Sequence, residues 1–211
     1  HPLIRRALSL NRAVCRLGGR VTAVRRRGLL TTLREDVDIV LQRDPAARNS
    51  LEVLLTYPGL HALWAHRLAH RLWQGRLKLI AKVIATWSRM LTGVEIHPAA
   101  AVGRRVFIDH GMGIVIGETA VVGDDVVLFH GVTLGGTRAN PGRRHPRIGT
   151  GAVLGAGATV LGSVTVGAHA RIGAGAVVLQ DVADGATAVG VPARVLPIGE
   201  TSPLWDPAAW I

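Results

Sequence analysis

Residues 147–178 read RIGTGAVLGAGATVLGSVTVGAHARIGAGAVV, and an aliphatic residue returns at every sixth position of this stretch. The spacing extends from residue 96 to about residue 183, with an interruption between residues 132 and 148. The sixth positions are Ile96, Val102, Ile108, Ile114, Ala120, Val126, Val132, Ile148, Leu154, Val160, Val166, Ile172 and Val178. A period of six fits neither an α-helix nor a flat strand. It predicts a parallel β-helix, in which short strands and tight turns wind around a narrow aliphatic core.

Composition and charge limit the classes of partner. The chain has 211 residues and a formal net charge of +11, which raises nucleic acid as a partner. Much of the arginine lies in residues 5–27, however, and the repeat carries no basic stripe with interleaved aromatic residues. We therefore expect no nucleic-acid partner.

Cysteine usage and hydropathy bear on the compartment. Cys15 is the only cysteine, so an intramolecular disulfide is impossible. No run of 18 or more apolar residues is present, so we expect no membrane span. These features favour a cytoplasmic location.

The chain divides into four predicted segments. Residues 1–30 are arginine-rich and lack acidic groups; they read as a disordered basic tail, as residues upstream of the natural start, or as a transit peptide. Residues 31–92 predict a small α-helical domain, with helices over 32–43, from 49 or 50 to before 58, 59–73 and 77–91. Residues 93–196 predict the β-helix, with an inserted loop at 138–147. Residues 197–211 predict a C-terminal tail.

The third predicted helix contains His61, His66 and His70, and the last two have the i, i+4 spacing of a helical metal pair. No acidic residue lies nearby to complete a metal site. We interpret these imidazoles as packing or solvent-facing groups and assign them no chemistry.

Asp109 and His110 stand out in a repeat that otherwise consists of small and aliphatic residues. A histidine there needs a partner unless it faces a cleft. Three hexapeptides make one coil of such a β-helix. The number of residues from Glu95 to His110 is slightly smaller than one coil, so we expect the two side chains to lie close together in adjacent coils. A carboxylate that holds an imidazole tautomer leaves the other ring nitrogen free to act as a general base.

The interruption is glycine-rich, polar and basic, and it should leave the coil as a loop. Its residues Arg143, Arg144 and His145 have two interpretations. They form a solvated turn, or they bind a substrate carboxylate, for which a guanidinium fork is well shaped.

Several short motifs occur in a characteristic order: RDPA at 43–46, PGLHA at 58–62, GVEIHPAA at 93–100, DH at 109–110, GETA at 117–120, VTLGGT at 132–137, RHP at 144–146 and GVPAR at 190–194. In this order they resemble the bacterial serine O-acetyltransferases, which belong to the hexapeptide-repeat acyltransferases. The resemblance covers about residues 32–196. It implies a left-handed parallel β-helix preceded by a small α-helical domain.

The resemblance also implies an activity and a set of site residues. The expected reaction is direct acetyl transfer from acetyl-CoA to the hydroxyl of L-serine, the first step of cysteine biosynthesis, with no metal. His110 matches the catalytic base and Glu95 the carboxylate that orients it. The amino acid is expected to contact Asp44, Asp109, Arg144 and His145, and CoA to contact Gly136, Ala156, Arg171 and Ala174, along the coil edge between neighbouring subunits.

Two residues depart from the common family pattern. Glu95 stands where aspartate is more usual, and its extra methylene still permits the hydrogen bond to the base. Met112 stands where a small hydroxyl residue is usual, and it could reshape the acceptor pocket. Homoserine or another hydroxy amino acid is therefore the alternative acceptor.

The resemblance implies assembly and partners as well. We expect a homotrimer, with a hexamer as the alternative, because the α-helical region is shorter than in relatives that pair trimers. The sequence ends in Ile211, and in this family a terminal isoleucine can enter the active site of O-acetylserine sulfhydrylase.

Two functions from other classes compete. One is a β-helix carbonic anhydrase, which would need a zinc triad from His97, His110, His130, His145 and His169, whose placement offers no convincing triad. The other is a non-catalytic scaffold, which would leave the Asp-His and Arg-His pairs without a role.

Overall fold

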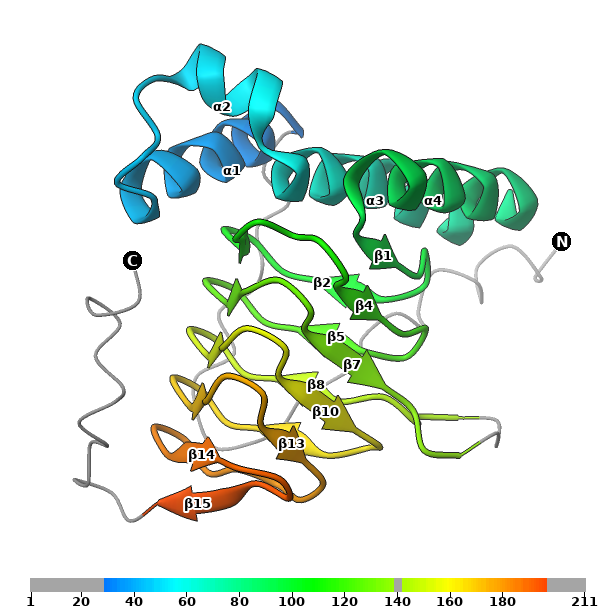
Figure 1. Ribbon diagram of the computed structural model, residues 1–211. Helices are drawn as coiled ribbons and strands as arrows, with labels where there is room; N and C mark the ends of the chain where they lie inside the picture. Colours follow the sequence, from blue (N-terminus) through cyan, green and yellow to red (C-terminus); the bar gives the residue numbers. More distant parts are fainter. Residues whose placement is uncertain (1–28, 139–141, 197–211) are drawn as a thin grey trace, which may run out of the picture.

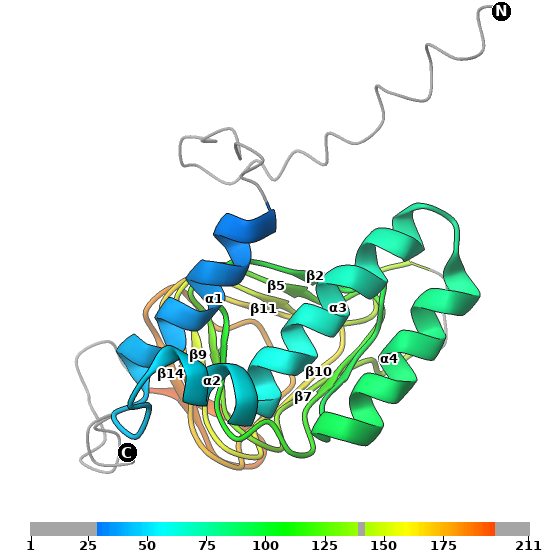
Figure 2. The ribbon, with the colours of Figure 1, turned by 90° about the horizontal axis from the view of Figure 1, so that it is seen from above.

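The computed structural model describes residues 29–138 and 142–196, and this part of the chain forms four helices followed by a triangular parallel β-helix (Figure 1). The helices lie across one end of the coil, as the view from above shows (Figure 2). The expected tail residues 1–28 and 197–211 lie outside the described residues. In the described part no helix is long and apolar enough to span a membrane.

The four helices are α1 (Leu29–Arg43), α2 (Ser50–Thr56), α3 (Pro58–Gln74) and α4 (Lys78–Thr92). Their positions confirm the predicted helices, although α1 begins before residue 32, so residues 29 and 30 belong to this helix and not to the basic tail. The Asn49 side chain accepts a hydrogen bond from the Glu52 N–H at 2.9 Å and caps α2. Pro58 opens α3, where a missing N–H costs nothing.

The strands are short and follow in chain order: β1 (Glu95–Ile96), β2 (Ala101–Val102), β3 (Phe107–Ile108), β4 (Val115–Ile116), β5 (Val121–Val122), β6 (Val127–Leu128), β7 (Thr133–Gly135), β8 (Arg147–Ile148), β9 (Val153–Leu154), β10 (Thr159–Leu161), β11 (Thr165–Val166), β12 (Arg171–Ile172), β13 (Val177–Val178), β14 (Thr187–Val189) and β15 (Arg194–Leu196). They form three sheets. Sheet A has the order β1-β4-β7-β10-β13, sheet B β11-β8-β5-β2 and sheet C β15-β14-β12-β9-β6-β3. Among these described strands all pairs are parallel except β14 with β15.

The chain passes from sheet A to B to C and back to A, so the turns form three corners of a prism. The A–B corner consists of turns 97–100, 117–120, 136–146 and 162–164, of which 139–141 are not described. The C–A corner consists of turns 109–114, 129–132, 155–158 and 173–176. Sheet A separates these two corners.

The structure corrects the register of the repeat. Thr159 pairs with Val177, which lies one coil of three hexapeptides later in the chain. Glu95 pairs with Val115, which lies two residues beyond the position that a coil of three hexapeptides would give. The first coil therefore contains two extra residues, which lie in the turn between β3 and β4. From β4 to residue 134, the inward-facing strand residues are Ile116, Val122, Leu128 and Leu134. The sixth positions predicted from the sequence for this part, which begin at Ile114, therefore lie two residues too early.

The core is a continuous aliphatic column inside the coil, which contains the inward residues of every layer. A second cluster joins the helices to the outer face of sheet C, where Phe107 and Val127 pack with Val37, Val40 and Leu60. Burial of each large aliphatic side chain contributes roughly 1.5–3 kcal/mol. The second cluster therefore fixes α1 and α3 against the strands that lead into the C–A corner.

Candidate active site

Asp109 and His110 lie in the two-residue expansion of the turn between β3 and β4. His110 has a positive φ of 56°, and the Gly111 N–H donates to the Asp109 carbonyl at 2.6 Å. The start of α3 packs directly on this segment, because a Cβ at Gly59 would overlap the Ile108 carbonyl oxygen. The Pro58-Gly59 motif thus allows the helix to approach the turn that presents the histidine.

The His110 imidazole is open to solvent, with 73% of its side chain exposed. Its Nε2 lies 3.8 Å from Oδ2 of Asp109, and its ring meets the ring of His130 edge to face at 5.7 Å between centroids. His130 occupies the equivalent turn one coil later. The C–A corner therefore presents two accessible imidazoles beside one carboxylate.

Asp44 reaches this corner from the segment after α1. Its Oδ1 accepts the Ala46 N–H at 2.8 Å, and its Oδ2 accepts the hydroxyl of Tyr57 at 2.6 Å. The pKa of Tyr57 is raised, first by burial and then by Asp44, with a smaller contribution from Asp109. The phenol therefore stays protonated and remains a donor to the Asp44 carboxylate.

Arg144 and His145 lie on the A–B corner, where the loop returns to β8. The Arg144 Nη2 donates to Oε2 of Glu118 at 2.5 Å, and His145 is buried, with 8% exposed. The bond to Arg144 holds the pKa of Glu118 below its usual range. Burial, and then the charge of Arg144, lower the pKa of His145. The corner therefore holds a charged guanidinium beside a neutral imidazole.

The residues expected to contact CoA fall on both corners. Ala156 and Ala174 lie in the C–A corner in successive coils below His130, and the Gly175 N–H donates to the Ala156 carbonyl at 2.8 Å. The edge below His110 is therefore lined by alanine and glycine, a smooth surface against which an extended ligand can lie. Arg171 lies in β12 of sheet C, and Gly136 lies in the A–B corner beside His145.

Glu95 lies in β1, opposite Val115 of the strand that follows the His110 turn. Its Oε2 accepts a hydrogen bond from Nη1 of Arg89 at 2.9 Å. The structure thus pairs Glu95 with Arg89 rather than with His110. The expectation that adjacent coils would join the two residues assumed a coil of three hexapeptides, whereas the coil that contains them is longer by two positions.

Met112 lies in the same turn and is exposed. A Cβ at Gly93, the left-handed C-cap of α4, would overlap its sulfur. Its side chain therefore lies over the end of α4.

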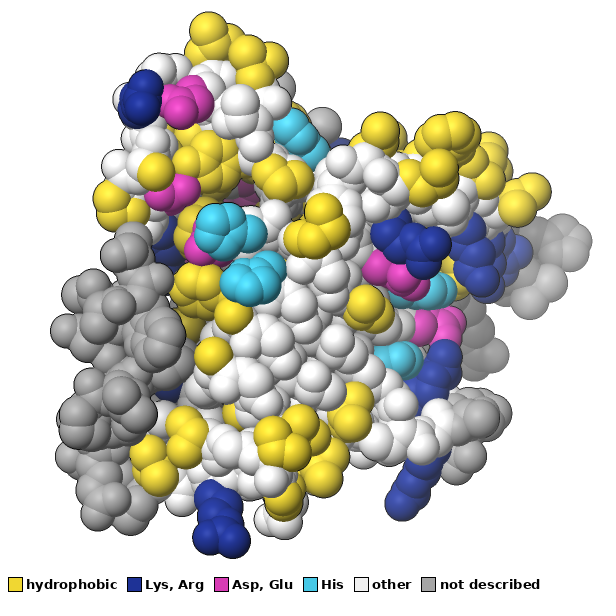
Figure 3. Space-filling view, viewed as in Figure 1, with side chains coloured by type: hydrophobic (Ala, Val, Ile, Leu, Met, Phe, Trp, Pro, Cys, Tyr) yellow, Lys and Arg dark blue, Asp and Glu magenta, His cyan; other side chains and the backbone are white. Residues whose placement is uncertain are grey.

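The two corners are separate within one chain. Asp44, Asp109 and His110 gather on the C–A corner, whereas Arg144 and His145 lie on the A–B corner, across sheet A. Figure 3 shows histidine side chains toward each side of this face of the coil, with the outer surface of the coil between them, and a further histidine side chain higher up, over the helices. The structure brings the predicted site residues together in two sets and not in one.

Three further residues belong to these sets, and sequence reasoning gave them no role. Tyr57 contacts Asp44, His130 contacts His110, and Thr119 contacts His145. His130 could have been found, because the sequence LFHG at 128–131 repeats the pattern of IDHG at 108–111 in the next coil. Thr119 lies within the quoted GETA motif, but its partner belongs to a different motif, RHP at 144–146.

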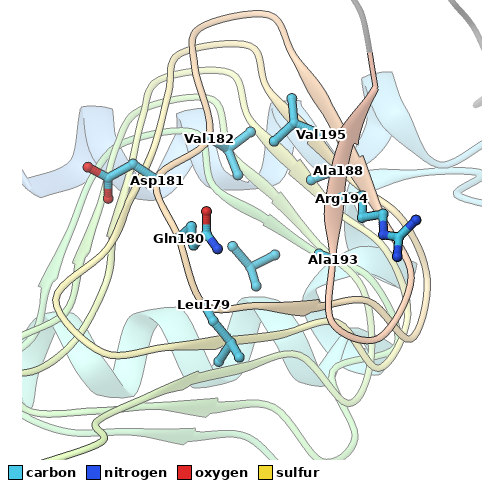
Figure 4. A pocket seen from close by; sticks show the side chains of 9 residues that line it. Leu179, Gln180, Asp181, Val182, Ala188, Ala193, Arg194 and Val195 are labelled. Carbon is cyan, nitrogen blue, oxygen red and sulfur yellow. The ribbon is translucent and has the colours of Figure 1, made fainter.

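An open pocket of about 320 Å³ lies at the end of the coil opposite the helices, between the β13–β14 turn and β15 (Figure 4). Leu179, Val182 and Val195 line it together with Gln180 and Arg194. It contains none of the expected site residues. Among the described residues no group of three or more side chains could hold a metal ion.

Comparison with known proteins gives consistent results. Residues 145–180 match the family model described as bacterial transferase hexapeptide (six repeats). A serine acetyltransferase of Bacillus pumilus is 59% identical over 164 residues, which are 78% of this chain and 76% of that protein.

Solved structures resemble the fold as well. The serine acetyltransferase of Neisseria gonorrhoeae in complex with serine has a TM-score of 0.77 and 42% identity, over 80% of this chain and 69% of that one. The serine acetyltransferase of Brucella abortus in complex with coenzyme A has a TM-score of 0.78 and 46% identity, over 82% and 68% of the two chains. These likenesses confirm the predicted left-handed β-helix with helices before it.

Proposed function

The chain belongs to the serine acetyltransferase family, and from this membership we propose how its two corners carry out one reaction. It is an acyltransferase that moves the acetyl group of acetyl-CoA to the hydroxyl of L-serine and yields O-acetyl-L-serine and CoA. The observation that carries the assignment is the 59% identity over 164 residues, which are 78% of this chain.

His110 is the general base in this proposal. It takes the proton of the serine hydroxyl as that oxygen attacks the thioester carbonyl carbon, and the imidazolium then returns a proton to the departing CoA sulfur when the C–S bond breaks. The exposure of the imidazole supports this role, because a base must reach both substrates. Glu95 orients the His110 ring once its carboxylate releases Arg89 and accepts a hydrogen bond from the imidazole instead. Glu95 lies opposite the strand that follows the His110 turn, and this position supports the assignment.

The amino acid is bound at both ends. Asp44 and Asp109 bind the ammonium group, and the Tyr57 hydroxyl holds the Asp44 carboxylate in place. Arg144 and His145 bind the carboxylate, for which a guanidinium and a neutral N–H donor are suited. CoA lies along the alanine and glycine edge below His110, with Ala156, Ala174 and Arg171 beside it, and Gly136 contacts it from the other corner.

A second copy of the chain completes the site, because one chain holds the two corners on opposite sides of sheet A. Closed three-fold symmetry places the C–A corner of each subunit beside the A–B corner of the next. The helix α4, which packs against β1 of sheet A, exposes the apolar side chains of Leu79, Val83, Trp87 and Met90. We therefore propose a homotrimer, with a hexamer as the alternative.

Two expectations depend on further experiments. The proposed contact of Ile211 with O-acetylserine sulfhydrylase lies outside the described residues. Deletion of Ile211 should weaken binding of the sulfhydrylase, and unchanged affinity would refute the contact. A cytoplasmic location is supported by the single cysteine.

The activity test is CoA release from acetyl-CoA with L-serine, compared with L-homoserine, for the unsubstituted protein and for His110→Ala. We expect rapid release with L-serine and a loss of about 10²–10⁴ in kcat for the variant, the usual contribution of a general base. His61→Ala, on the other side of α3, is the matched control. No serine-dependent release from the unsubstituted protein would refute the function, and a fully active His110→Ala would refute the base.

A further inference from the structure

The turn after β4 is built into the loop that carries Arg144 and His145. The hydroxyl oxygen of Thr119 accepts the backbone N–H of Arg144 and the backbone N–H of His145, both at 3.1 Å. One side chain thus anchors two consecutive residues that are distant from it in the sequence. The end of the inserted loop is fixed on the coil at this point.

The same residue contacts the His145 ring. The Thr119 backbone N–H donates to Nδ1 of His145 at 3.2 Å, and the Thr119 hydroxyl lies 2.9 Å from the same nitrogen. Because an N–H can only donate, Nδ1 must be the acceptor and carries no proton. A neutral imidazole has one N–H, so the proton of His145 is on Nε2.

The Nε2 edge of His145 faces two glycines. A Cβ at Gly117 would overlap Nε2, and a Cβ at Gly136 would come within 3.3 Å of it. The ring therefore occupies space that any side chain at residue 117 would fill. With Nδ1 turned to Thr119, the donor Nε2–H is the group left for a ligand.

The charges around the ring are consistent with this tautomer. Arg144 and Glu118 act on His145 directly, and His97, in the turn after β1, and Lys82, on α4, are further titratable groups that face this cluster. The Glu118 carboxylate is occupied by the Arg144 guanidinium at 2.5 Å. Glu118 and Thr119 thus hold two neighbouring groups, one a cation and the other a neutral donor.

We propose that Thr119 is a positioning residue, which fixes His145 as the Nε2–H tautomer so that it donates to the carboxylate of the acceptor amino acid. The proposal rests on the proposed function, since the carboxylate belongs to L-serine. Thr119 acts through His145 and does not itself touch the substrate. Its loss should therefore affect the binding of L-serine and leave the binding of acetyl-CoA unchanged.

The kinetic test compares Thr119→Val, which keeps the shape but loses the hydroxyl, with Thr119→Ser, which keeps the hydroxyl. We expect Thr119→Val to raise the KM for L-serine about 10- to 100-fold, the effect of a lost hydrogen bond to a charged group. The KM for acetyl-CoA should stay within twofold, and Thr119→Ser should restore most of the serine affinity. An unchanged KM for L-serine in Thr119→Val, or an equal rise for both substrates, would overturn the proposal.

A direct measurement of the tautomer does not depend on activity. In ¹⁵N-histidine-labelled protein near pH 7.5, with His145→Gln used to assign the signals, Nδ1 of His145 should be unprotonated and Nε2 protonated. Thr119→Val keeps the backbone N–H that donates to Nδ1 but loses the hydroxyl 2.9 Å from it, so the share of the Nδ1–H tautomer should rise above that of the unsubstituted protein. A dominant Nδ1–H form in the unsubstituted protein would overturn the proposal even if serine is the substrate. Absence of serine acetylation, by contrast, would remove the proposed function and leave this tautomer measurement interpretable.

Discussion

The two corners beside sheet A use histidine in opposite ways. His110 on the C–A corner is mostly exposed, and its contact with Asp109 is long, at 3.8 Å. His145 on the A–B corner is buried, and both its backbone and its ring are hydrogen-bonded to Thr119. A proton-transferring group must meet both substrates and change its protonation state, whereas a binding group works best when its donor is fixed in advance. The difference in environment therefore matches the different roles that we propose for the two histidines.

The largest effect on L-serine binding is expected when the positive charge of the A–B corner, Arg144, is removed. Arg144→Ala should raise the KM for L-serine by about 30- to 300-fold, because a charge-assisted hydrogen bond to the carboxylate is lost. Arg144→Lys keeps the charge but not the fork and should recover only part of the affinity. Steady-state kinetics with varied L-serine will check this. A fall in kcat with unchanged KM would instead place Arg144 in the chemical step.

A smaller effect is expected when the buried imidazole is displaced without removing any polar group. The methyl of Gly117→Ala would overlap Cδ2 of the His145 ring, so the ring must move and Nε2–H is misdirected. We expect a rise of about tenfold in the KM for L-serine, as for one lost hydrogen bond. Gly136→Ala, whose methyl would stay 3.3 Å from Nε2, should have less effect. Equal effects of the two variants would show that the space at Gly117 does not set the position of the His145 ring.

The smallest predicted effect is that of pH on the KM for L-serine, and it tests whether the buried His145 stays neutral. Burial, and then the charge of Arg144, lower the pKa of His145 below its ordinary 6.5, so this ring becomes protonated at a lower pH than a free imidazole does. The neighbouring Glu118 stays ionised because Arg144 lowers its pKa as well, and burial lowers the pKa of His97. The KM for L-serine should therefore change less than about twofold between pH 7.5 and 6.5, since a group whose pKa lies below 6.5 is still more than half neutral at pH 6.5. A steep rise in this KM across the interval would show that His145 becomes protonated there.

The fold was predictable because its signal repeats in every coil, but its register was not. Ile114 and Ile116 are both buried, so every sixth residue remains apolar whichever of the two series is followed. Two extra residues in the turn before β4 therefore leave no gap in the hydrophobic pattern. The shift becomes visible only when the strand pairs are known.

The sequence indicates candidate site residues where polar or charged residues interrupt a repeat of small ones, as at His110 and Arg144, and their roles stay predictions. Thr119 was not assigned, because a threonine in a turn is ordinary until its partner, distant in sequence, is known. Glu95 was assigned from its place in the chain, and because it accepts a hydrogen bond from Arg89 in the structure, its contact with His110 stays a prediction. The division of the site between two corners also depends on which turn each residue occupies. The sequence pattern placed the strands from β4 to residue 134 two residues too early, so it did not assign these turns correctly.

The central claim is that the C–A corner of one subunit works with the A–B corner of another, and mixing two defective variants tests it most directly. His110→Ala and Arg144→Ala should each be nearly inactive alone at low L-serine. Co-refolded or co-expressed in equal amounts, they should regain up to about a quarter of the unsubstituted activity, because random trimers pair an intact His110 with an intact Arg144 at one site in four. If the mixed trimers assemble and show no more activity than either variant alone, the two corners do not form a shared site and the account is wrong.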